Sequence, residues 1–272
     1  MQPTLTALQT NCFFQKNLFK KPERKIYLSA VLFCIFSFFA SAQTDTLKVE
    51  IPDWALPGSA THQQVPPPAD FHRETRTENM SIGIFDGVSD VGGALVPGSS
   101  FYDKSTDEYT IISAGYNIWY TRDEFRYLWK KMSGDISLAA NVKFPDSTGY
   151  GDRKVVLIIR QTLEDDSKEI MIALHGAGLM HMAWRPEKGA ELQEMRIKEE
   201  SAIRLGIEKD GDDFTAFIKM PDESMRQAGE PVKLNFDEPF YVGIGFTSHL
   251  PATVDTGIFS DVVLENKTGG VK

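Results

Sequence analysis

The chain has 272 residues, of which 42% are hydrophobic, and it carries a formal net charge of −9 at pH 7. This length is sufficient for one large domain or two small ones with a substantial apolar core. The acidic balance provides no surplus of Lys and Arg to neutralise phosphate. It therefore argues against nucleic acid and anionic membrane surfaces as partners and leaves neutral ligands such as glycans open.

The first 42 residues predict a secretory signal peptide. A basic region from Lys16 to Lys25 precedes an apolar run from Ile26 to Phe39, and Ala40-Ser41-Ala42 has the A-x-A pattern of a cleavage site. The apolar run of about fourteen residues is shorter than the roughly 20 residues that span a bilayer. We therefore expect cleavage after Ala42 rather than an N-terminal membrane anchor, no membrane span in the mature chain, and a periplasmic or secreted location.

The expected cleavage would remove both cysteines of the chain, Cys12 and Cys34. It would also remove five basic residues and one acid, which changes the formal net charge from −9 to −13. A disulfide-free exported domain depends on its apolar core for stability, and this favours a large β-sandwich over a small cross-linked module.

A Pro-rich segment follows the leader. Residues 43–82 contain five prolines among scattered polar residues, which predicts an extended linker or an arm lying over the domain. The domain itself is expected over residues 83–267.

Short apolar stretches separated by Gly, Asp, Asn and Pro recur through this domain and predict strands. The clearest predicted strands are 109–113, 136–144, 155–160, 170–175, 179–185, 202–208, 214–220, 240–247 and 257–264. A single helical turn is expected near 121–125, and no internal repeat is present. About a dozen strands without intervening helices predict an antiparallel sandwich or barrel.

The central stretch, from Val155 to Arg185, reveals the most about the fold. Val155 to Arg160 is apolar and β-branched, which predicts a strand buried on both faces. Two polar or Gly-rich turns separate it from two further apolar strands that end at His175 and Arg185. Two successive hairpins of this kind predict the middle of an antiparallel sheet.

Four sequence fragments, taken in order, carry a resemblance. They are Tyr116 to Trp119 with Asp123 to Tyr127, Ser133 to Ile136, Val155 to Arg160 with the turn Asp165 to Lys168, and Tyr241 to His249 with a closing strand near Phe259 to Val262. Together they resemble the concanavalin A-like lectin/glucanase superfamily and, more narrowly, an uncharacterised bacterial secreted family of that fold. The resemblance covers roughly residues 84–265 and implies an all-β, antiparallel β-sandwich of the concanavalin A-like jelly-roll type. It also implies carbohydrate binding, but no particular reaction. One departure is Arg153-Lys154, where the family usually has Gly or Ala before its third strand.

An acidic stretch suggests glycoside hydrolysis at first sight. Glu164, Asp166 and Glu169 fit the E-x-D-x-x-E pattern of laminarinase-like retaining glycoside hydrolases, whose acids project from one face of a strand. The intervening residues are Asp165, Ser167 and Lys168, which favour turns. The stretch therefore predicts a solvated turn, and we name no catalytic residue.

Two patterns raise the possibility of a metal. His175 and His181 are expected on successive strands and could lie near one another, but two histidines without a nearby carboxylate fall short of a zinc site. Asp210, Asp212 and Asp213 surround Gly211 and could offer oxygens to Ca²⁺, although their spacing does not fit an EF-hand and a hairpin turn is favoured. No metal site is predicted, and calcium remains an open alternative.

The candidate ligand-binding residues are polar or aromatic side chains within otherwise apolar strands. Sugars bind by stacking on aromatic rings and by hydrogen bonds to planar donors such as Arg. His181 and Arg185 share one face of their strand, and Trp184 lies on the other. For Trp119 and Trp129, burial in the core is the favoured interpretation. For Arg160, His181 and Arg185, a ligand-facing role and ion pairing with the many acids are equally open. The candidates are Trp119, Tyr127, Arg160, His175, His181, Trp184 and Arg185.

These observations favour non-catalytic recognition of a carbohydrate on the concave sheet. The first alternative is a glycan-active enzyme, a hydrolase or lyase, which needs two carboxylates across a cleft near Arg160 and Arg185. The second is an envelope interaction module that binds a protein partner through the Pro-rich arm and has a filled concave face.

Overall fold

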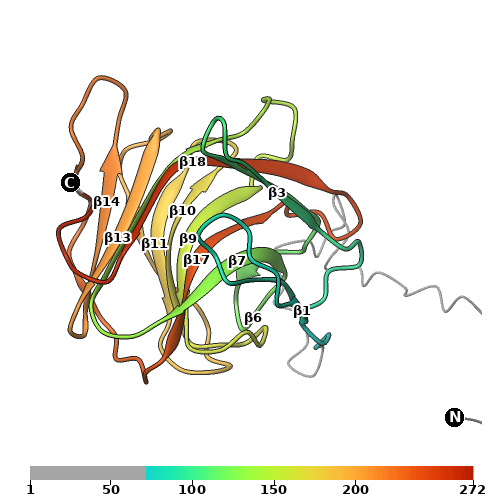
Figure 1. Cartoon of the computed structure of the whole chain (residues 1–272), viewed down its shortest axis with the longest axis horizontal. Helices are drawn as coiled ribbons and strands as arrows, with labels where there is room; N and C mark the ends of the chain where they lie inside the picture. Colours follow the sequence, from blue (N-terminus) through green and yellow to red (C-terminus); the bar gives the residue numbers. More distant parts are fainter. Residues whose placement is uncertain (1–71, 272) are drawn as a thin grey trace, which may run out of the picture. The chain divides into compact units, whose positions relative to one another are not determined.

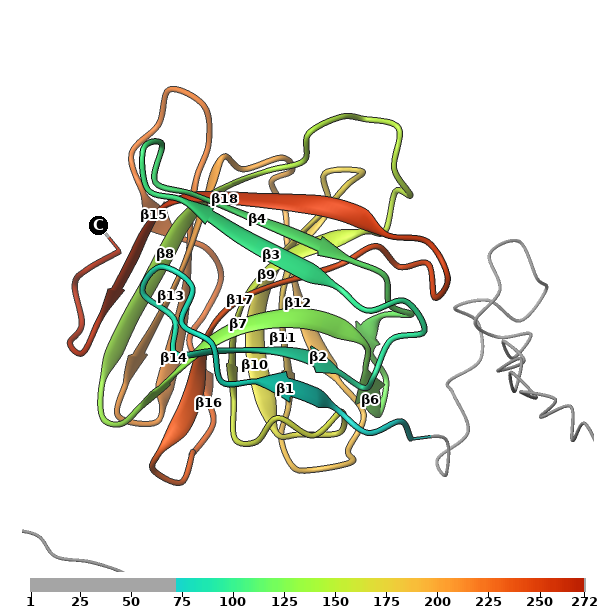
Figure 2. The ribbon, with the colours of Figure 1, turned by 45° about the vertical axis from the view of Figure 1, so that its right-hand side comes forward.

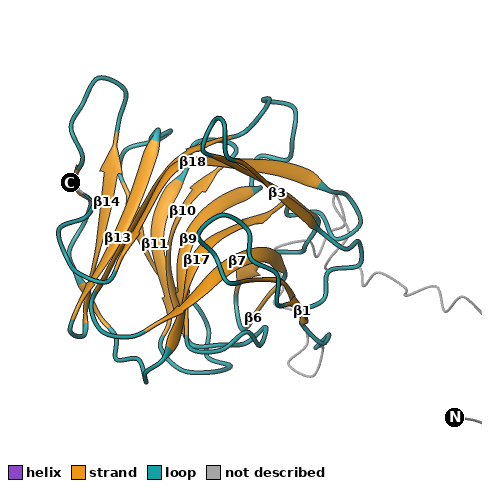
Figure 3. Ribbon diagram, in the orientation of Figure 1, coloured by secondary structure: helices purple, strands orange, loops and turns teal. Residues whose placement is uncertain are grey.

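The computed structural model describes residues 72–271, which fold as two antiparallel sheets packed face to face (Figures 1 and 3). The expected all-β antiparallel sandwich is confirmed. Among these residues no helix is long and apolar enough to cross a membrane. The predicted signal peptide and residues 43–71 of the predicted arm lie outside the described residues.

The first sheet has eight strands in the order β1-β2-β7-β17-β9-β10-β11-β12. The three strands of the central stretch are neighbours, as their pattern predicts, but they lie toward one edge of the sheet, where only β12 follows β11. The bounds are β1 Arg76–Glu78, β2 Gly87–Val91, β7 Phe125–Met132, β9 Lys154–Arg160, β10 Glu169–His175, β11 Met180–Arg185, β12 Gln193–Ile197 and β17 Phe240–Thr247.

The second sheet has the order β15-β14-β13-β8-β18-β4-β3, with β16 also paired to β14 (Figure 2). Its bounds are β3 Ser99–Asp103, β4 Glu108–Ser113, β8 Ile136–Lys143, β13 Arg204–Asp210, β14 Asp213–Lys219, β15 Arg226–Gln227, β16 Val232–Lys233 and β18 Asp255–Glu265. A small separate hairpin joins β5, Ile118–Trp119, to β6, Arg122–Asp123.

The expected helical turn near 121–125 is wrong, because Arg122 and Asp123 form β6 and Phe125 begins β7. The domain is also longer than expected at both ends. Arg76 pairs with Asp90 in the first sheet, so the sandwich begins before residue 83. Val271 is buried against Ala139 and Phe217, so it continues past residue 267.

The first sheet separates two apolar clusters. Its inner face packs against the second sheet through alternate residues such as Val155, Leu157 and Ile159. The intervening residues Val156 and Ile158 enter a second cluster on the outer face, the face that points away from the second sheet. This explains the continuous apolar pattern of β9 and confirms its burial on both faces.

The outer cluster is covered by segments that come from distant parts of the sequence. Ile118 of β5, Leu163 and Leu192 pack against the apolar residues of β9, β10 and β11. Complete burial of each large aliphatic side chain contributes about 1.5–3 kcal/mol to stability. Much of the outer face is therefore filled, and a ligand site has to lie beside this cover rather than beneath it.

Candidate functional site

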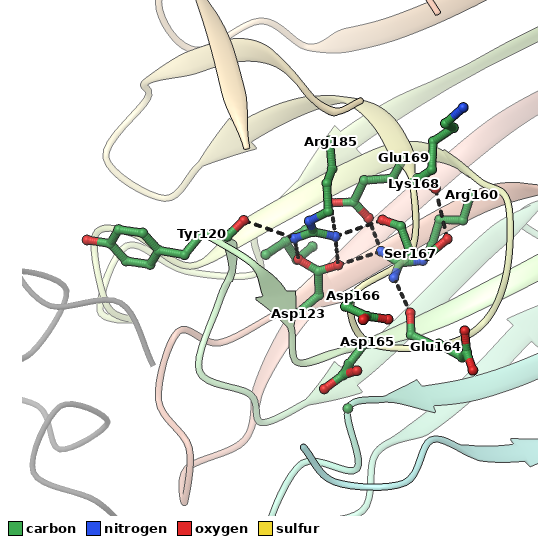
Figure 4. A network of polar contacts seen from close by, with 12 residues as sticks. Tyr120, Asp123, Arg160, Glu164, Asp165, Asp166, Ser167, Lys168, Glu169 and Arg185 are labelled. Carbon is green, nitrogen blue, oxygen red and sulfur yellow. Dashed lines mark hydrogen bonds and ion pairs between the residues drawn. The ribbon is translucent and has the colours of Figure 1, made fainter. Parts of the chain in front are cut away.

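Two arginines and two carboxylates form a buried network on the outer face (Figure 4). Glu169 of β10 lies opposite Arg160 of β9 on one side and Arg185 of β11 on the other. Both arginines also bind Asp123 of β6. The Nη1 atom of Arg160 lies 2.7 Å from Asp123 Oδ2, and Arg185 donates to both Asp123 oxygens at 2.8 Å. All four side chains are fully buried.

This network corrects the expectation that Arg160 and Arg185 face a ligand. Further N–H groups of both arginines donate to backbone carbonyls of the adjoining loops. A buried charge is tolerated when it is paired, and Asp123 and Glu169 supply that pairing here. The network fastens the β5–β6 hairpin to the sheet, and its carboxylates are inaccessible to a substrate.

Two more candidates lie in apolar clusters. Tyr127 is fully buried in the outer cluster, and its hydroxyl donates to the Ile158 carbonyl at 3.1 Å. Trp184 lies on the opposite face of its strand and packs, half-buried, against the main core. The core alternative is confirmed for Trp129, whose indole N–H donates to Ser89 Oγ at 2.9 Å.

The acidic stretch does not form a catalytic strand. Glu164 is exposed in a turn, whereas Glu169 is fully buried in β10, so the two do not share an accessible face. The turn is less solvated than expected, because Asp165 is buried against His72 at 2.9 Å. The hairpin favoured for Asp210 to Asp213 is confirmed by the pairing of these two residues.

The remaining candidates meet in a cavity of about 220 Å³ at one end of the outer face. We call this cavity the histidine pocket. It is lined by Asn117, Trp119, Asp152, Lys154, His175, Leu179, His181, Glu194 and His249.

The two histidines of the pocket are in contact, as their spacing suggested. His175 ends β10 and His181 lies near the start of β11, on the same face of the sheet. Their Nε2 atoms are 3.5 Å apart, and the ring planes make an angle of 77°. The assumption that no carboxylate lies nearby is wrong. His181 Nδ1 is 3.0 Å from Glu194, and His175 Nδ1 is 3.5 Å from Asp152.

An aromatic ring and a buried cation complete the pocket. Trp119 of β5 is partly exposed and stacks on His181, with ring centroids 5.4 Å apart and an angle of 7° between the planes. Lys154, the first residue of β9, is 1% exposed, and its Nζ atom lies 5.5 Å from the centre of the Trp119 ring. Asp152 and Glu194 have half-exposed side chains, so they form the rim above a buried floor.

Burial is the main cause of the pKa shifts of the side chains on the floor of the pocket. It lowers the pKa of His175 to about 4, assisted by the charge of Lys154, and it also lowers the pKa of His181. Burial lowers the pKa of Lys154 to about 8. Both histidines are therefore neutral at pH 7, and Lys154 is mostly protonated.

The lowered pKa of His175 predicts a loss of stability in acid. In the unfolded chain this histidine takes up a proton near pH 6.5, but in the folded protein only near pH 4. Between these values the unfolded state binds more protons, so the free energy of unfolding falls as the pH drops from 6.5 to 4, by about 3 kcal/mol for this group.

Urea unfolding at pH 7 and at pH 4.5 measures this effect. The variant His175→Gln should lose less stability between the two pH values than the wild type. Equal losses in both proteins would show that His175 is not the group responsible.

Several pocket residues were not among the candidates. The sequence did mark Lys154 as unusual, because Arg153-Lys154 precedes an apolar strand at a place where the family that the chain resembles usually has Gly or Ala. Nothing in the sequence marked Asp152 or Glu194, because acidic residues in loops and at strand edges usually face solvent. Their approach to the histidines depends on the pairing of β9, β10, β11 and β12.

Comparison with known proteins supports the fold. No protein-family model matches the chain, and no curated protein sequence is similar to it. A protein of unknown function from Saccharomyces cerevisiae has a similar structure, with 12% identity, a TM-score of 0.50, and coverage of 64% of this chain and 95% of that one.

Two further solved structures are more distant. The carbohydrate-binding module CBM66 from Bacillus subtilis has 15% identity, a TM-score of 0.43, and coverage of 62% of this chain and 92% of its own. An alginate lyase from Klebsiella pneumoniae has 10% identity, a TM-score of 0.43, and coverage of 62% and 84%. Similarity at this level concerns the fold alone. The described residues of the chain form an antiparallel β-sandwich.

Proposed function

We propose that this protein is a non-catalytic carbohydrate-binding protein and that it holds one saccharide unit in the histidine pocket. The observation that carries the proposal is the pairing of the partly exposed Trp119 ring with a floor of buried polar groups. A sugar presents an apolar face that stacks on an aromatic ring, and hydroxyls that need directed hydrogen bonds. The pocket offers both within one cavity.

The polar groups of the pocket suit hydroxyls. Lys154 is a donor, while the carboxylates of Asp152 and Glu194 are acceptors on the rim. His175 and His181 are neutral at pH 7 and present planar nitrogen groups on the floor. A neutral sugar can use all of these groups without introducing an unpaired charge.

The size of the cavity limits the ligand. A volume of about 220 Å³ corresponds to roughly seven water molecules in the liquid. Such a cavity suits a single sugar ring, so we propose recognition of the end of a glycan or of one residue that projects from it.

A larger cavity of about 580 Å³ is the competing location. It is lined by residues 72–75 and 77, by residues 163–166 and by Lys188. Among the described residues that line it, the imidazole of His72 is the only aromatic ring on which a sugar could stack, and its wall begins at the first described residue. We therefore place the ligand in the histidine pocket.

A glycan array tests the proposal. The protein is expected to bind glycans that share one terminal or projecting saccharide. The variant Lys154→Met removes the donor from the floor and should abolish or strongly weaken this binding. Lys188→Met is the matched control, because it removes an exposed lysine of the larger cavity.

The outcomes separate the two locations. Binding that survives Lys154→Met but is lost in Lys188→Met would move the site to the larger cavity. If the protein unfolds cooperatively on heating, and is therefore folded, but binds no glycan on the array, this result would contradict carbohydrate binding.

A glycan-active enzyme is the second candidate. The observation that favours it is Lys154 at the bottom of the pocket, because burial lowers its pKa to about 8 and such an amine can exchange a proton near neutral pH. Release of shorter sugars from the bound glycans, lost in His175→Gln, would replace the binding proposal with this one.

Export and an envelope partner remain predictions. The expected signal peptide and residues 43–71 of the arm lie outside the described residues. The periplasmic or secreted location follows from the leader alone.

A further inference from the structure

We propose that His175 and His181 bind a divalent transition-metal ion through their Nε2 atoms. This goes beyond carbohydrate binding and does not depend on it, since the pair could hold a metal with or without a sugar in the pocket. The geometry of the two rings and their carboxylates carries the proposal.

The Nδ1 atoms of both histidines face carboxylates. His181 Nδ1 lies 3.0 Å from Glu194 Oε2, and His175 Nδ1 lies 3.5 Å from Asp152 Oδ1. An ionised carboxylate only accepts hydrogen bonds, so each Nδ1 favourably carries the hydrogen.

This assignment leaves a lone pair on each Nε2 atom. The two atoms are 3.5 Å apart and face one another. Two facing lone pairs repel unless a cation lies between them.

The distances fit a shared metal ion. Two nitrogen ligands at about 2.0–2.1 Å from Zn²⁺ with a tetrahedral angle are about 3.3–3.4 Å apart, close to the observed separation. A metal-binding histidine usually donates its other N–H to a carboxylate or carbonyl, which fixes the ring and strengthens the ligand. Glu194 is hydrogen-bonded to His181 Nδ1, and Asp152 lies beside His175 Nδ1 at the ion-pair distance of 3.5 Å.

The charge of the pocket also fits. With neutral imidazoles, Lys154 contributes one positive charge while Asp152 and Glu194 contribute two negative charges, so these groups carry a net charge of −1. No group of three or more His, Cys, Asp or Glu side chains in the described part of the chain is arranged to hold a metal. The site therefore has two protein ligands, and water or a bound ligand would fill the other positions.

The competing arrangement is a direct hydrogen bond between the rings. If His175 carries its hydrogen on Nε2, it can donate to His181, but its Nδ1 lone pair then faces the Asp152 carboxylate. This arrangement needs no metal, and the two possibilities predict different results on titration.

The test uses the full chain after treatment with a chelator, titrated with Zn²⁺ in a calorimeter and with Co²⁺ by visible absorption, in the absence of any glycan. We expect one equivalent of Zn²⁺ to bind. His181→Gln should abolish binding, and Glu194→Gln should weaken it by about 10–100-fold because the ring loses its carboxylate. His72→Gln is the control for adventitious binding to an exposed histidine and should change nothing.

A second measurement keeps the test valid if a variant folds poorly. The ¹⁵N resonances of the imidazoles in the wild-type protein should move at Nε2 of both rings when Zn²⁺ is added, but not when Ca²⁺, which prefers oxygen ligands, is added. Absence of Zn²⁺ binding, binding that survives His181→Gln, or Nε2 resonances that do not respond to Zn²⁺ would each overturn the proposal.

Discussion

Replacing Asp123 with Ala is expected to lower the free energy of unfolding by about 3–5 kcal/mol. Asp123 pairs with Arg160 and Arg185, and all three side chains are fully buried. Removing the carboxylate leaves two buried guanidinium groups whose only remaining carboxylate partner, among residues 72–271, is Glu169. Urea unfolding followed by fluorescence measures the difference.

The matched control is Glu164→Gln. Glu164 also pairs with a cation, Lys188, but both side chains are more than half exposed. Exposed ion pairs contribute about 0–1 kcal/mol, so this variant should remain close to the wild type. A loss below about 1 kcal/mol in Asp123→Ala would show that the buried network does not fasten the β5–β6 hairpin.

Replacing Trp119 with Ala is expected to weaken glycan binding by at least about 30-fold, the effect of losing an aromatic residue that contributes about 2 kcal/mol or more to a binding site. Trp119 supplies the only indole ring among the described residues that line the pocket, and it stacks on the His181 ring. Calorimetric titration with a glycan selected from the array gives the affinity.

Two further variants test whether the loss of affinity comes from the aromatic face of Trp119. Trp119→Phe keeps an aromatic face and should bind with intermediate affinity. Phe101→Ala removes an exposed ring from β3 of the other sheet and should bind like the wild type. Unchanged affinity in Trp119→Ala would contradict a stacking role for this ring.

The strand pattern made the fold predictable. The apolar run from Val155 to Arg160 and the two hairpins after it place β9, β10 and β11 side by side, because hairpin turns join neighbouring antiparallel strands. The short strands β5, β6, β15 and β16 have two residues each, too few to show a period of two. The supposed helical turn near 121–125 arose from this ambiguity.

The site was only partly predictable, for a similar reason. The period of two correctly places His181 and Arg185 on one face of β11 and Trp184 on the other. It does not tell what covers that face. Asp123, from a hairpin distant in the sequence, covers the arginine end, whereas the histidine end stays open to a cavity.

This distinction changes how the site should be probed. Arg185→Ala would remove one charge from a buried network, so a loss of binding could arise from loss of stability. Variants of Trp119 and Lys154 act at the pocket itself. Their effects on ligand binding can be separated from unfolding by a melting curve of the same sample.

The most direct test of the histidine pocket is a nuclear magnetic resonance titration that follows the indole N–H signals of ¹⁵N-labelled protein. When a glycan selected from the array is added, we expect the Trp119 signal to shift progressively until the binding site is saturated. The Trp129 and Trp184 signals should stay in place because these rings pack in the outer cluster and against the main core. A saturable interaction that leaves the Trp119 signal unchanged would show that the sugar binds elsewhere.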